Sequence, residues 1–277
     1  MIKPNTLPRG RALLAIAHPG HELRVFRWCE LAKPDVAVLT DGSGAAGASR
    51  VHRTTSLLAG IGAKPAAFYA PTTDLALYDA VLRGDLDLML GLVGRLTDVI
   101  VSGRYDYVVG DAPEGEIMGH DLFRGLLDAA LGVARRATGR EIASYDFPLE
   151  AAPCSVHPAV ATGTYYLHLD DAAVERKINH GLAYEEIAHE VVRAVETHGR
   201  DAFAVECLRP SLTEAGLASF TGTPSYERHG ERQVAEGRYA EPVRYRQHVA
   251  PLLQAIRRES RALSAGLGGA PAKTSAA

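Results

Sequence analysis

The chain has 277 residues, of which 47% are hydrophobic and 23% charged, as in a soluble globular protein. The formal net charge is −3 and no Lys/Arg-rich run occurs, so neither nucleic acid nor a membrane is expected as a partner. The apolar stretch 12–17 is too short for a signal peptide or a membrane span. Three scattered cysteines indicate a reducing compartment rather than a disulfide framework, and hence a cytoplasmic protein.

Short apolar runs alternate with helical segments over the first half of the chain. This alternation predicts an α/β fold, a Rossmann-like three-layer sandwich with a mostly parallel sheet. The continuous hydrophobicity of VAVL and YVV favours strands that are buried on both faces. The predicted strands are 11–17, 35–40, 66–70, 106–110 and 141–147, and the predicted helical segments are 21–33, 50–62, 75–90, 92–103 and 120–137.

The pattern changes after Pro153. A further strand is expected over 164–170, a long helix over 171–199 that breaks near Gly181, and a helix over 246–263. Residues 200–250 are rich in aromatic and charged residues and in turn signals. We interpret residues 1–263 as a single domain whose helical C-terminal extension begins at about residue 154, and 264–277 as a disordered tail.

Polar side chains follow three of the predicted strands. His18 follows the first strand, Asp41 the second and Asp111 the fourth. Open parallel sheets bind ligands outside the carboxyl ends of their strands, near the point where the strand order reverses. We therefore expect these side chains to share one site.

The stretch AIAHPGHELR (15–24) holds two histidines three residues apart, His18 and His21. One interpretation is a turn in which one imidazole caps a helix and the other is buried in the core. The other is half of a zinc site, because short-spaced histidines can aim at one point. A third imidazole, His120, opens the helix that follows the Asp111 strand, with Asp121 beside it.

A rival pattern is DGSGAAG (41–47), where Gly42, Gly44 and Gly47 match the dinucleotide fingerprint G-x-G-x-x-G. That fingerprint needs an acid at the end of the next strand, but that strand ends AAFYAPTTD and Asp74 comes late. A loop over a substrate pocket explains these glycines as well.

Four segments in register resemble the PIG-L/LmbE-like zinc deacetylases, over residues 11–147. AHPGHE (17–22) resembles the AHPDDE signature, and LTDGSG (39–44) resembles the T-x-G-x-x-G segment. Arg50 with SLLAGIGA (56–63) resembles the RxxE…LG helix, and GHDLFRGLLDAA (119–130) resembles the PDH helix start.

The resemblance implies a bound Zn²⁺, or another divalent metal, held by His18, His21 and His120. Three positions depart from the family pattern. His21 replaces a ligand carboxylate, Gly20 replaces the Asp that acts as general base, and Arg53 replaces the Glu of RxxE.

Three neutral imidazoles leave the full charge on the metal. A zinc ion held by three histidines can lower the pKa of bound water to about 7, so hydrolysis does not depend on a strong base. Asp111, Asp41 and Glu22 are the candidates for proton transfer, although a cap, a turn and a first-turn acid explain them too. Arg50, Arg53 and Glu114 are the candidate substrate-binding residues, with surface solvation as the alternative for Arg53.

The sequence thus predicts a zinc-dependent hydrolase that removes an acyl group, an acetyl group above all, from the nitrogen of an amino sugar or related small molecule. The alternative is a diverged relative that binds metal and ligand without deacetylation, or that catalyses another metal-assisted step. A nucleotide-binding oxidoreductase is a third interpretation. The expected partner is a small-molecule substrate, and a homo-oligomer is left open.

Overall fold

The computed structural model describes residues 7–44, 47–216 and 222–267. Its strands in these ranges form one sheet in the order β3-β2-β1-β4-β5-β7-β6. Strands β1 to β5 are parallel, whereas β7 runs antiparallel to both β5 and β6. The strands are β1 (Ala12–Ile16), β2 (Asp35–Thr40), β3 (Lys64–Thr72), β4 (Tyr107–Asp111), β5 (Ala143–Phe147), β6 (Tyr165–His168) and β7 (Val205–Pro210). The predicted α/β fold with a mostly parallel sheet is confirmed.

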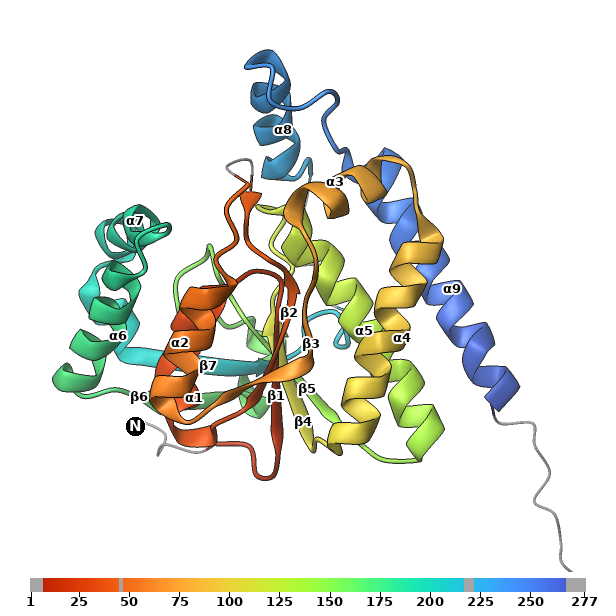
Figure 1. Cartoon of the computed structure of the whole chain (residues 1–277). Helices are drawn as coiled ribbons and strands as arrows, with labels where there is room; N and C mark the ends of the chain where they lie inside the picture. The colour runs from red at the N-terminus through yellow and green to blue at the C-terminus, as the bar shows by residue number, and fades with distance from the viewer. Residues whose placement is uncertain (1–6, 45–46, 217–221, 268–277) are drawn as a thin grey trace, which may run out of the picture.

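Helices cover both faces of the sheet (Figure 1). Alternate residues of β1 point to opposite sides: Leu13 and Ala15 join a core with α3, α4, α5 and α9, while Leu14 and Ile16 join a core with α1, α2 and α6. The helices are α1 (Phe26–Ala32), α2 (Val51–Ile61), α3 (Asp74–Leu82), α4 (Leu86–Gly103), α5 (Met118–Thr138), α6 (Asp171–Ala183), α7 (Ala188–His198), α8 (Ser225–Ala235) and α9 (Ala250–Leu267), with the short 3₁₀ turn η1 (His21–Val25) before α1.

The chain order in the sheet reverses at β1. Strand β1 pairs with β2 on one side and with β4 on the other, so the connections leave β1 in opposite directions. Side chains after β1 and β4 therefore lie beside the crevice in which open α/β sheets bind ligands. Helices α7 and α8 stand clear of the sheet on different sides of the molecule (Figure 1).

The second half of the chain differs from the sequence prediction in three respects. The helix expected over 171–199 is two helices, interrupted between Ala183 and Ala188 rather than at Gly181. The segment 200–250, which reads as turns, holds both β7 and α8. Helix α9 continues to Leu267, so residues 264–267 are helical, and the rest of the predicted tail, 268–277, lies outside the described residues.

The cysteine prediction is wrong. Cys154 and Cys207 form a disulfide with their Cα atoms 5.4 Å apart, a usual separation for such a bond. The antiparallel β5–β7 pairing brings these distant residues together, and Cys29 remains a buried free thiol. Cysteine usage therefore no longer supports the predicted cytoplasmic location. In the described ranges, none of the helices has both the length and the apolarity that crossing a membrane requires.

Candidate metal centre

A cavity of about 1210 Å³ lies over the carboxyl ends of the central strands. The segments after β1, β2 and β4 line its floor, and residues of α3, α7 and α8 line its walls. This volume exceeds the usual range of about 300–1,000 Å³ for small-molecule pockets. The cavity is therefore large enough for a ligand bigger than a single sugar ring.

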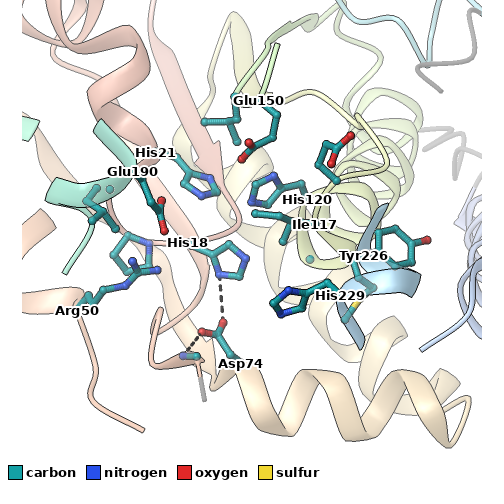
Figure 2. A pocket seen from close by; sticks show the side chains of 18 of the residues that line it. His18, His21, Arg50, Asp74, Ile117, His120, Glu150, Glu190, Tyr226 and His229 are labelled. Atoms are coloured by element: carbon teal, nitrogen blue, oxygen red, sulfur yellow. Dashed lines mark hydrogen bonds and ion pairs between the residues drawn. The ribbon is translucent and has the colours of Figure 1, made fainter. Parts of the chain in front are cut away.

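Three imidazoles converge in this cavity from two strand ends. His18 and His21 flank the turn after β1, and His120 lies in the first turn of α5, after β4. The ring centroids are 5.3 Å apart for His18 and His21, 5.3 Å for His18 and His120, and 4.5 Å for His21 and His120. Figure 2 shows the three rings facing one another.

Two glycines make this convergence possible. Gly20 has φ 107°, a left-handed conformation that turns the chain sharply between the first two histidines. At Gly119 a Cβ atom would lie 2.9 Å from His18 Nε2, so only glycine lets the His18 ring approach α5 so closely. The glycine before the histidine in PGH (19–21) and in MGH (118–120) thus allows the turn after β1 and the start of α5 to lie close together.

Acceptors hold the Nδ1 atoms of His18 and His21. His21 Nδ1 lies 2.8 Å from Asp111 Oδ2, which also accepts the backbone N–H of Ala17 at 2.7 Å. His18 Nδ1 lies 2.7 Å from Thr40 Oγ1 and 3.1 Å from Asp74 Oδ1 (Figure 2). With the proton on Nδ1 of each ring, the Nε2 atom keeps a free lone pair. Carboxylates that accept from Nδ1 of a histidine ligand have this effect in metal sites.

Burial sets the charge state of this cluster. Burial, reinforced by the neighbouring His18 ring, holds the pKa of His21 well below its ordinary value, and burial and His21 do the same for the pKa of His120. Burial also raises the pKa of Asp111 to about 6, against the opposing effects of His120 and the Ala17 N–H. Although burial opposes it, the hydrogen bond from His18 holds the pKa of Asp74 well below its ordinary value. The His21 and His120 rings are thus neutral, the form in which imidazole ligates metals.

The cluster fits a tetrahedral metal ion in its donor set. Three imidazoles on one zinc ion, with Zn–N distances near 2.0–2.1 Å, place their ring centroids about 5 Å apart, close to the separations observed. His120 Nε2 is buried and has no hydrogen-bond partner, which leaves a polar atom that a metal would satisfy. Within the described ranges, no three His, Cys, Asp and Glu side chains stand ready to hold a metal as they are, so ligation requires the rings to adjust.

The turn at Gly20 leaves no room for a side chain. A Cβ atom at Gly20 would lie 2.8 Å from Ile187 Cδ1 and 3.8 Å from the Tyr184 ring. A larger residue at this position would have to displace the end of the Ile187 side chain and would be strained at φ 107°.

Four predicted site residues lie outside the cavity lining, namely Glu22, Arg53, Glu114 and Asp111. Glu22 is fully buried, where its carboxylate accepts the Gly20 N–H at 2.8 Å and the Thr54 hydroxyl at 2.7 Å, so it braces the turn and has no free oxygen for proton transfer. Arg53 forms surface ion pairs with Glu185 and Glu186, and the predicted substrate role is not supported.

The Glu114 carboxylate is bonded to backbone groups. Its carboxylate accepts the backbone N–H groups of Leu149, Glu150 and Ala151 at 2.7–2.9 Å, so it fixes a neighbouring loop instead of facing a substrate.

Two predicted residues, Asp41 and Arg50, line the cavity, and Asp111 contacts one of the histidines. The Asp111 carboxylate lies against His21 Nδ1, at 2.8 Å. Asp41 lines the cavity, but its Oδ1 atom accepts the Ser43 N–H at 3.1 Å, as in a turn. Arg50 lines the cavity, and its buried Nε atom has no hydrogen-bond partner.

Several cavity residues escape the sequence analysis. Asp74 follows β3, so the same strand-end argument could have identified it. The others lie on segments that read as turns or surface helix, and only the fold brings them here: Glu150, Glu190, Tyr226 and His229.

The fold and the site together define an α/β protein with a histidine cluster at the point where the sheet order reverses. Neither family models nor curated proteins match the chain. Among solved structures, it is similar to that of the antimicrobial reagent A40926 pseudoaglycone deacetylase Dbv21, with a TM-score of 0.51 and 16% sequence identity. The match covers 73% of this chain and 97% of that one, and at this identity it shows the fold. A deacetylase is thus built on the same fold.

Proposed function

We propose that this protein is a zinc-dependent hydrolase that removes an acyl group, an acetyl group above all, from the nitrogen of an amino sugar or a related molecule. The observation that carries the proposal is the convergence of His18, His21 and His120 at the ends of β1 and β4. The similarity to a deacetylase structure and the resemblance of AHPGHE to the PIG-L/LmbE signature support the same chemistry.

Each residue has a distinct part in this scheme. His18, His21 and His120 would hold the metal through Nε2, while Asp74 and Asp111 fix the first two rings through Nδ1. A bound zinc ion would polarise the acyl oxygen and lower the pKa of water.

Arg50 is the candidate for substrate recognition. Its guanidinium lies in the cavity wall and forms no ion pair within the described ranges, so it can bind an anionic group of the substrate. The cavity volume of about 1210 Å³ favours an amino sugar that carries a further substituent over a free monosaccharide.

One observation favours a second candidate function. The closed turn at Gly20 leaves no carboxylate where the deacetylase resemblance places the general base. A protein that binds metal and ligand without hydrolysis would show this arrangement as well.

Metal analysis followed by an activity screen tests the proposal. Purified protein loaded with Zn²⁺ is dialysed, its metal content is measured, and acetate release is followed over a panel of N-acetylated amino sugars and their glycosides. One zinc per chain together with acetate release, both lost in His120→Ala, supports the hydrolase. Bound zinc without acetate release favours the binding function, and a chain that retains no zinc contradicts both.

A further inference from the structure

Hydrolysis of an amide by water requires a group that takes a proton from the water and returns it to the leaving nitrogen. Asp111 and Asp74 are engaged with histidine rings, and Gly20 has no side chain. Of the other carboxylates that line the cavity, Glu150 and Glu190 point toward the three rings in Figure 2.

The backbone around Glu150 is fixed by two side chains from opposite sides. The Arg24 guanidinium donates to the carbonyl oxygens of Pro148, Leu149 and Ala151 at 2.5–2.9 Å. The Glu114 carboxylate accepts the N–H groups of residues 149–151. Six hydrogen bonds therefore hold a four-residue loop directly after β5, and preorganisation of this kind is what a reacting group requires.

The Glu150 side chain itself is free. Within the described residues its carboxylate forms no hydrogen bond or ion pair, and Figure 2 shows it pointing toward the histidine rings. His120, whose buried Nε2 atom has no hydrogen-bond partner in the described part of the chain, lines the same cavity. Both glutamates are exposed, but the Glu190 carboxylate lies 3.9 Å from His189 Nε2 and its helix α7 has no buried residues.

Neighbouring groups also shift the pKa of Glu150. Burial, then Glu114 and Glu190, raise its pKa, while Arg24 opposes them. A base whose pKa is raised toward neutrality returns its proton more readily to a leaving amine.

We infer that Glu150 is the proton-transfer residue of the reaction, an inference that rests on the proposed deacetylase function. The carboxylate takes one proton as the oxygen of water bonds to the acyl carbon of the amide. The carbon–nitrogen bond then breaks, and the nitrogen leaves as the amine with the proton that Glu150 returns. The products are a carboxylic acid and an amine, and Glu150 ends as a carboxylate.

Glu150→Gln tests the inference, with Glu196→Gln as the matched control. Glu196 lies on α7 and does not line the cavity, so the control removes the same charge nearby without touching the site. We expect Glu150→Gln to lower kcat for acetate release about 10²–10⁴-fold, with zinc content and melting temperature unchanged.

A second measurement does not depend on knowing the substrate. Acetohydroxamic acid binds zinc as an anion and gives its proton to a neighbouring base. Its affinity for the zinc-loaded protein, measured by calorimetry, therefore depends on that base. We expect Glu150→Gln to weaken this binding about tenfold or more, as for the loss of a hydrogen bond to a charged group. Glu196→Gln should match the wild type in both measurements.

The outcomes separate the two claims. Hydroxamate binding and kcat within about twofold of wild type in Glu150→Gln would overturn the role of Glu150 and leave the proposed function standing. Wild-type protein that binds no hydroxamate in the presence of zinc would overturn the proposed function, and the role of Glu150 with it.

Discussion

Asp111→Asn tests the geometry that prepares His21 for a metal. One oxygen, Oδ2, accepts both the Ala17 N–H at 2.7 Å and His21 Nδ1 at 2.8 Å, and Asp111 is only 2% exposed. In the asparagine variant a neutral amide oxygen replaces the charged acceptor. Its NH₂ group takes the place of Oδ1, a buried atom that has no partner in the wild type.

The expected loss of zinc affinity follows from what is known of carboxylates that are hydrogen-bonded to a histidine ligand. Their loss weakens metal binding by about 10–100-fold, which corresponds to about 1.4–2.7 kcal/mol. Competition with a chromophoric chelator, in slightly alkaline buffer where the carboxylate is ionised, measures the zinc dissociation constant directly.

Asp35→Asn is the matched control. Asp35 is another buried strand carboxylate, bonded to Arg11 and Tyr105 at the amino end of β2, the opposite end of the parallel strands from the cavity. The control should lower the melting temperature and leave zinc affinity unchanged. Equal zinc affinity in Asp111→Asn and wild type, or equal weakening in both variants, would refute the reasoning.

Three further predictions concern the surroundings of the site. Gly20→Ala should lower the free energy of unfolding by about 1–3 kcal/mol in urea denaturation, because φ is 107° and the new Cβ would lie 2.8 Å from the Ile187 side chain. The control Gly60→Ala lies in a helix with no atom near the new Cβ and should not lower the free energy of unfolding. Equal effects in the two variants would contradict this prediction. Without reductant, a thiol reagent should label no cysteine in the native protein and one after unfolding, because burial raises the pKa of the Cys29 thiol well above its ordinary value; three labelled thiols would disprove the disulfide. Glu190→Gln should move the acidic limb of the kcat/KM profile to lower pH, because Glu190 is one of the groups that raise the pKa of Glu150; an unchanged or upward-shifted limb would contradict this coupling.

Much of the fold could be predicted because its signals are local. Continuous apolar runs such as VAVL and YVV mark β2 and β4, and amphipathic segments mark α2 and α5. Alternation of the two implies the parallel sheet, and the sheet implies where a site lies. His18, His21 and His120 could therefore be placed together without coordinates.

Other features depend on contacts between distant segments. The pairing of Cys154 with Cys207 follows from the antiparallel β5–β7 contact, and β7 lies in a segment dominated by turn signals. Glu22 and Glu114 read as free acids, because their backbone and hydroxyl partners can be identified only in the folded chain. Glu150 could not be predicted, because its position depends on a loop that is held by two residues far away in sequence.

The central claim is that three imidazoles bind one metal ion at the ends of β1 and β4. The most direct test is an anomalous-difference map, measured at the zinc absorption edge, from a crystal of the zinc-loaded protein. A single peak bonded to the Nε2 atoms of His18, His21 and His120 is the predicted result. A map with no peak among these rings, or a peak bonded to other residues, would contradict the account.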